Sequence, residues 1–171
     1  MDMQFRPFTH KFVAVLNKKV PVNLLMNALG HMAAGLAASY PNITEMRFDS
    51  YIDRDGGNHK SISDNPFIIL SADNSNKIRT LRNGLIEKNI HFVDFTSTMT
   101  VGTYLEQQQR TKETPEIELE YYGVCLFGEI NTLNELKDIK LQRFNNISNK
   151  FNKLTKRNYS REWVKNNLRL T

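Results

Sequence analysis

An uncharged segment from Val20 to Thr44 restricts the folding of this chain more than any other feature. Between Lys19 and Glu45 no side chain carries a fixed charge. The segment is long enough to cross a bilayer, but a proline and several polar residues in it would be costly in hydrocarbon. These residues are Pro21, Asn23, Asn27, His31, Ser39 and Asn42. We therefore expect no membrane span, and we assign the segment to a core or to the lining of a site.

The same segment predicts a helix with two different faces. Pro21 suits the first helical turn, and Pro41 ends the helix. Apolar residues, most of them large, recur at spacings of four and three on one face: Val22, Met26, Leu29, Ala33, Leu36 and Tyr40. The opposite face holds Asn27, His31, Ala34 and Ala38. Because this second face carries no charge, we expect another element to cover it.

Alternating strand and helix signals fill residues 10–137. The Val-rich run "KFVAVLN", residues 11–17, predicts a buried central strand. Further strands are predicted at 46–53, 66–70, 90–95 and 117–130, with 66–70 also buried and 53–66 a polar loop. Helices are predicted at 75–88, 104–112 and 131–137, the second beginning with a capping box of Thr103 and Glu106. This order predicts an α/β sandwich around a largely internal sheet.

Positive charge is concentrated at the C-terminal end. Residues 1–136 hold 13 Lys and Arg against 16 Asp and Glu, a net −3, whereas residues 137–171 hold 10 against 2, a net +8. Within 138–171 the spacing of apolar residues predicts a basic amphipathic helical extension. We expect this extension to pack on the domain or on a second subunit, or else to bind RNA or an acidic partner.

Signals for export, disulfides and metal sites are missing from the sequence. The N-terminus lacks the apolar stretch of a secretory signal, and the single Cys125 cannot form an intramolecular disulfide. We therefore expect a cytoplasmic protein. The histidines His10, His31, His59 and His91, taken with Cys125, show no pair at metal-ligand spacing, so we expect no metal ion and no cofactor.

The first candidate site is the pair Asn27 and His31, one helical turn apart. An imidazole can act as acid, base or hydrogen-bond acceptor, and a neighbouring amide can fix the orientation of a shared ligand. The alternative is a hydrogen-bonded structural pair beneath another element, because buried polar groups need partners in any case.

The second candidate site lies in "VDFTSTMT", residues 93–100. Asp94 stands at the end of a predicted strand and is followed by Thr96, Ser97 and Thr98. In open α/β sheets ligands collect at the carboxyl ends of strands, which favours a site at Asp94 and Thr98. The alternative is turn and capping chemistry, for which Asp, Ser and Thr are the usual residues.

The order of these parts resembles an uncharacterised bacterial domain family that is grouped with the type II peptidyl-tRNA hydrolases. The resemblance rests on "KFVAVLNKKVPVNLLMNALGHMAAGLAA", "NPFIILSADN", "HFVDFTSTM" and "IELEYYGVCLFGE", and it covers residues 10–137. Its most specific piece is the strand followed by a helix with Asn27, Ala28 and His31. The resemblance implies a three-layer α/β/α sandwich with a four-stranded mixed sheet, and a homodimer.

The hydrolase motifs match this chain only in part. The hydrolases carry Lys-x-Ala-Ala-Gln-x-x-His on the helix and Asp-x-Gly-x-Thr later in the chain. With His31 as the shared histidine, Leu24 stands at the lysine position and Ala28 at the glutamine position. The second motif aligns with Asp94, Thr96 and Thr98, with threonine 96 in place of glycine. The missing lysine removes a cation that would meet tRNA phosphate or help to activate water.

These observations predict a protein that binds a small-molecule or nucleotide-like ligand in a cleft near Asn27, His31, Asp94 and Thr98. His31 would be the acid, base or acceptor, Asn27 its orienting partner, Asp94 a second catalytic or anchoring group, and Thr98, with Thr96 beside it, a hydroxyl donor. One alternative is a hydrolase of an ester or amide bond on an RNA-linked substrate. Another is an interaction module that docks through its C-terminal helix.

Overall fold

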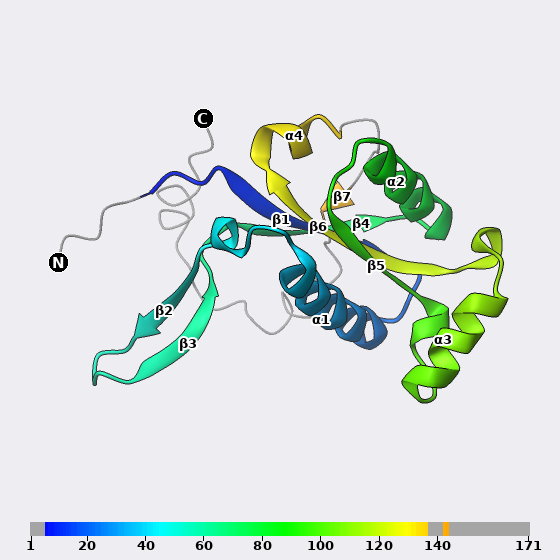
Figure 1. The fold of residues 1–171 in the computed structure, drawn as a ribbon, viewed down its shortest axis with the longest axis horizontal. Coiled ribbons are helices and arrows are strands. Elements are labelled where there is room, and N and C mark those ends of the chain that lie inside the picture. Colours follow the sequence, from blue (N-terminus) through cyan, green and yellow to red (C-terminus); the bar gives the residue numbers. More distant parts are fainter. Residues whose placement is uncertain (1–5, 137–141, 144–171) are drawn as a thin grey trace, which may run out of the picture.

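A mixed β-sheet forms the centre of the molecule in this computed structural model, which describes residues 6–136 and the backbone of 142–143 (Figure 1). Its four longer strands are β1 (His10–Asn17), β4 (Phe67–Ala72), β5 (Phe92–Thr96) and β6 (Tyr121–Glu129), in the order β5-β6-β1-β4. β1 is parallel to β4, and β6 is antiparallel to both β1 and β5. The two-residue β7 (Gln142–Arg143) pairs with the outer edge of β4. The predicted four-stranded mixed sheet is thus confirmed, with β7 as a short addition.

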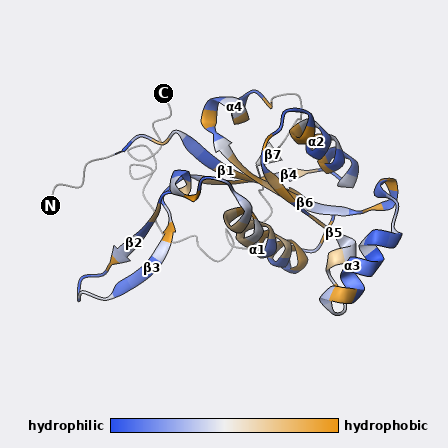
Figure 2. Cartoon of the chain, viewed as in Figure 1, coloured by the Kyte–Doolittle hydropathy of each residue, from blue (hydrophilic) through white to orange (hydrophobic). Residues whose placement is uncertain are grey.

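Two helices cover opposite faces of this sheet. Helix α1 (Val22–Ser39) packs over Ala14 and Leu16 of β1, whereas α2 (Ser75–Glu87) packs over Val13 and Val15 of the same strand. Because successive strand residues point to opposite faces, β1 supplies both cores and is buried along most of its length. Figure 2 shows the apolar residues gathered on α1 and the sheet strands. The prediction of a buried central strand at 11–17 is confirmed.

The core face of α1 differs from the predicted one. Its fully buried residues are Leu25, Ala28, Met32 and Leu36, whereas Val22 and Met26 are each 53% exposed. Apolar residues line two neighbouring stripes of this helix, so periodicity alone could not choose between them. The buried stripe combines the small Ala28 with Met32, whose methyl group lies where the side chain of a residue at 123 would otherwise stand. Gly123 of β6 therefore allows α1 to approach the sheet closely.

A β-hairpin projects away from the sheet (Figure 1). It consists of β2 (Phe48–Ile52) and β3 (Asn58–Ser63), which pair antiparallel with each other and not with the main sheet. The polar loop predicted over 53–66 is therefore wrong for its middle part. The strand predicted at 46–53 is confirmed as β2, whereas β3 was missed because its exposed, mostly polar side chains give no apolar alternation.

Strand β4 is exposed where burial was predicted. Phe67, Ile68 and Ile69 are 44%, 36% and 37% exposed. β4 lies next to the edge of the sheet, and β7 pairs only with Leu70 and Ser71. The apolar run correctly predicted a strand, but its neighbours leave one end of that strand uncovered.

The remaining elements follow the predicted order. Helix α2 begins after Asn74, whose side chain accepts a hydrogen bond from the Lys77 backbone. Helix α3 (Tyr104–Glu113) begins with the predicted capping box of Thr103 and Glu106, and α4 (Ile130–Asn134) follows β6. Short 3-10 helices are η1 (Ile43–Met46), η2 (Ser97–Met99) and η3 (Glu116–Glu118).

The structure tests the predictions on a membrane span and on the C-terminal extension only for the residues that it describes. No helix among the described residues is long and apolar enough to cross a membrane. The predicted helical extension at 138–171 lies outside the described residues, apart from the backbone of 142–143. Its binding to RNA, to a partner or to the domain stays a prediction.

Candidate functional site

The structure places Asn27 and His31 on the exposed side of α1. Both residues are exposed, as are Ala34 and Ala38, so no described element covers the face that was expected to be covered. The His31 ring stacks on Phe95 of β5, with 5.8 Å between the ring centroids. His31 is thus anchored against the α1 side of the sheet at its rim.

Asp94 lies on the other face of the sheet. It precedes Phe95 in β5, so its side chain points toward α2. There its carboxylate accepts a hydrogen bond from Nε of Arg82 at 2.5 Å. The Arg82 guanidinium also lies over the rings of Phe92 and Tyr121, 5.9 and 5.8 Å from their centroids. The structure therefore does not bring His31 and Asp94 into one cleft.

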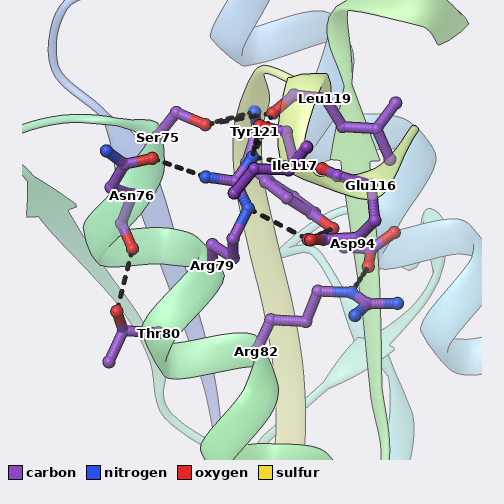
Figure 3. Close-up of polar contacts among 10 residues, drawn as sticks. All are labelled: Ser75, Asn76, Arg79, Thr80, Arg82, Asp94, Glu116, Ile117, Leu119 and Tyr121. Atoms are coloured by element: carbon purple, nitrogen blue, oxygen red, sulfur yellow. Dashed lines mark hydrogen bonds and ion pairs between the residues drawn. The ribbon is translucent and has the colours of Figure 1, made fainter. Parts of the chain in front are cut away.

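Asp94 borders a polar cluster that ties α2 to the segment entering β6 (Figure 3). The Arg79 guanidinium donates hydrogen bonds to the backbone carbonyls of Glu116, Ile117 and Leu119 and to the Glu116 carboxylate. The Tyr121 hydroxyl donates to the same carboxylate at 3.0 Å. These bonds join elements that are distant in sequence, which is a structural role for the cluster.

Thr96 and Thr98 form a chain of buried hydroxyl groups. The Thr96 and Thr98 hydroxyls are 2.8 Å apart, and Thr98 is also 2.8 Å from the hydroxyl of Thr111 in α3. Thr96 is 1% exposed and Thr98 6% exposed. Because both hydroxyls are occupied in joining β5 to α3, this arrangement favours the structural alternative for the second predicted site.

A pocket of about 400 Å³ lies at the opposite end of β5 from Thr96 and Thr98. It is an open depression bordered by the segment after α1, the start of β5, the end of β6 and α4. Side chains from all four segments line it, among them Tyr40, Asn42, Glu45, His91, Phe127 and Glu129. A concave site with several converging polar groups is the usual form of a small-molecule site.

Glu45 is the centre of the polar contacts in this pocket. Its carboxylate accepts hydrogen bonds from the Tyr40 hydroxyl at 2.8 Å and from the Asn42 amide at 2.9 Å. Nε2 of His10 lies 3.4 Å from the same carboxylate. Nε2 of His91 is hydrogen-bonded to the Ser39 hydroxyl at 2.9 Å. His91, Tyr40 and Glu45 are thus held in fixed positions around one concavity, and His10 contacts Glu45 from outside the lining.

The electrostatics of the pocket set its protonation state. Burial, together with the hydrogen bond to Glu45, raises the pKa of Tyr40 to about 12. The hydrogen bond from Tyr40 lowers the pKa of Glu45 below its usual value. At neutral pH, therefore, Tyr40 is a protonated donor and Glu45 an ionised acceptor.

The free energy of unfolding is expected to fall as the pH rises from about 10 to about 12. An unfolded tyrosine loses its proton near pH 10, whereas burial raises the pKa of Tyr40 and of Tyr121 to about 12. The folded chain then binds more protons than the unfolded chain, so it loses stability across this window. Urea unfolding at pH values of about 9 and about 11 measures the decline. Tyr121→Phe should make it shallower and Tyr51→Phe, in the exposed hairpin, should not; equal declines in the two variants would contradict the assignment.

Sequence reasoning missed this pocket because its residues are far apart in the chain. His10 and His91 were considered only as metal ligands, and within the described residues no group of three His, Cys, Asp or Glu side chains could hold a metal ion. Tyr40 was predicted to be a core residue of α1. The one local signal was that Tyr40 precedes the proline that ends the helix, which places it at the rim of the sheet rather than above it.

These features define a mixed α/β domain with a pocket at one end of its sheet. The chain belongs to the family described as "Protein of unknown function (DUF2000)", which matches residues 10–142. The predicted membership in an uncharacterised family is thereby confirmed.

One solved structure with a similar fold is a protein of unknown function from Agrobacterium tumefaciens strain C58. The similarity covers 80% of this chain and 98% of that one, with a TM-score of 0.69 and 16% sequence identity. At this identity the likeness shows a shared fold alone. No curated protein matches the chain.

Proposed function

We propose that this protein binds a small molecule in the pocket formed by Tyr40, Glu45, His91, Phe127 and Glu129. The observation that carries the proposal is the convergence of ionisable and aromatic side chains from three chain segments on one concavity of about 400 Å³. Perturbed ionisable groups in a cleft are typical of functional sites. The proposal keeps the small-molecule function predicted from the sequence and moves its location.

We also propose that the fold is related to that of the type II peptidyl-tRNA hydrolases. This relation is supported by the four-stranded mixed sheet with helices on both faces, which is what the resemblance implies. The pairing of Asp94 with Arg82 weighs against hydrolase chemistry at that residue. The homodimer also stays a prediction; the exposed face of α1, which has no charged side chain, is the surface that we would expect it to use.

A ligand of this pocket should stabilise the wild-type protein and should not stabilise His91→Ala. A compound present at about 100 times its dissociation constant adds about 2.7 kcal/mol, or roughly 5–10 °C of melting temperature for a domain of this size. A thermal-shift screen of metabolites and nucleotides on the full chain would find such compounds.

Two matched histidine variants locate the site. His59→Ala, in the exposed hairpin, should keep the full response to any compound found. His31→Ala tests the location predicted from the sequence. A compound whose effect is lost in His31→Ala and kept in His91→Ala would overturn the proposed pocket in favour of the α1 face.

A further inference from the structure

We infer that the ligand of this pocket is a small organic cation, an amine or an ammonium compound. The inference rests on the proposed function and adds the chemical class of the ligand to it.

The charges at the pocket are negative. Glu45 and Glu129 line it, and among its described lining residues there is no lysine or arginine. Two nearby basic side chains are held elsewhere: Arg47 pairs with Asp64 at 2.7 Å, and the Lys11 ammonium donates to Asn134 at 2.6 Å. Lys88, which precedes Asn89, is exposed and does not line the pocket. An anionic ligand would therefore meet two carboxylates without a compensating fixed positive charge in the wall.

Glu129 is the carboxylate available to a ligand. The oxygens of Glu45 already accept hydrogen bonds from Tyr40 and Asn42. The Glu129 side chain is exposed and makes no hydrogen bond or ion pair with the side chains of residues 6–136. The charge of Glu129 is one of the causes that raise the pKa of Tyr40, so this carboxylate lies within electrostatic reach of the aromatic wall.

Aromatic rings form the rest of the cation-binding chemistry. Tyr40 and His91 are the half-buried rings of this wall, nearly perpendicular to each other with centroids 5.5 Å apart, and the 1% exposed Phe127 supports Tyr40 from behind at 4.9 Å. The face of an aromatic ring attracts a cation, and a carboxylate beside aromatic rings is the usual environment for binding ammonium groups. The Tyr40 hydroxyl donates its proton to Glu45 and so cannot also donate it to a ligand anion. The wall thus favours a cation for two reasons: its aromatic rings and carboxylate attract positive charge, and its tyrosine has no proton left to donate to an anion.

Three probes of equal length test this inference: butylamine, butanol and butyrate, added to the full chain labelled with nitrogen-15. Butylamine should give saturable shifts of amide signals in residues 128–133, and the apparent dissociation constant should rise about threefold to tenfold in Glu129→Gln. Glu135→Gln is the matched control, because this exposed glutamate follows α4 outside the pocket lining. Its affinity should match that of the wild type.

The possible failures separate the inference from the proposed function. Saturable binding of butyrate or butanol but not of butylamine would overturn the cation and leave a small-molecule pocket in place. Butylamine binding that is unchanged in Glu129→Gln would also overturn the inference. If no probe shifts these signals and no compound of the thermal-shift screen depends on His91, both the cation and the pocket are wrong.

Discussion

Arg79→Ala is expected to lower the free energy of unfolding by about 2–4 kcal/mol, because hydrogen bonds to charged groups contribute more than neutral ones. The Arg79 side chain is only 12% exposed. It donates to three backbone carbonyls, of Glu116, Ile117 and Leu119, and its guanidinium lies 5.4 Å from the centroid of the Tyr121 ring. Without it, the turn that leads into β6 keeps only the hydrogen bonds of Ser75 as polar contacts with α2. Urea unfolding of the full chain at neutral pH measures the loss.

Two further arginine variants separate the geometry of Arg79 from its charge. Arg79→Lys keeps the positive charge but cannot reproduce the planar fork that reaches several carbonyls at once, so it should recover less than half of the lost stability. Arg54→Ala, in the exposed turn of the hairpin, should change stability by less than about 0.5 kcal/mol. An Arg79→Ala protein as stable as Arg54→Ala would show that these bonds carry no stability.

Gly123→Ala is the second substitution with a large expected effect, a loss of about 1–3 kcal/mol from overpacking. A Cβ atom at this position would lie 2.8 Å from Cδ2 of Leu16, 2.9 Å from Cε of Met32 and 3.0 Å from the Val15 carbonyl oxygen. The Met32 methyl can move, but the Val15 carbonyl belongs to the central strand and is held in the sheet. Either α1 or β1 must shift, and both are core elements.

Gly30→Ala is the matched control for this position. A Cβ atom at Gly30 of α1 would meet nothing within 4 Å. Because alanine has less conformational freedom in the unfolded chain than glycine, this change should stabilise the protein by about 0.4–1 kcal/mol. Thermal unfolding of the two variants should therefore shift in opposite directions, and a stabilising Gly123→Ala would contradict the close approach of α1 to β6.

Local patterns were sufficient to predict most of the helices and strands. The capping box of Thr103 and Glu106 marked the start of α3, because a cap is formed within one helical turn. Asn89, the residue after the helix predicted at 75–88, adopts the left-handed conformation with a φ of 52°, which asparagine tolerates better than most residues. The Val-rich run of β1 was recognisable because a strand buried on both faces is apolar at nearly every position.

Patterns failed where neighbours decided the outcome. The apolar run of β4 predicted a strand but could not show that its position near the sheet edge leaves Phe67 and Ile69 exposed. The two candidate sites, at His31 and at Asp94, lie apart for a similar reason. Asp94 and Phe95 are adjacent in sequence but point to opposite faces, so His31 stacks on one side of the sheet and Arg82 binds on the other.

The sequence by itself determined the succession of strands and helices, the helix caps and the α/β class, because these depend on hydrogen bonds and periodicities within about a dozen residues. Tertiary structure alone decided which stripe of α1 is buried, through the space that Gly123 leaves for Met32. It also decided which polar groups converge. Tyr40 and His91 are brought together only because the end of α1 and the start of β5 meet at one rim of the sheet. Residues this far apart in sequence leave no local pattern from which their contact could be predicted.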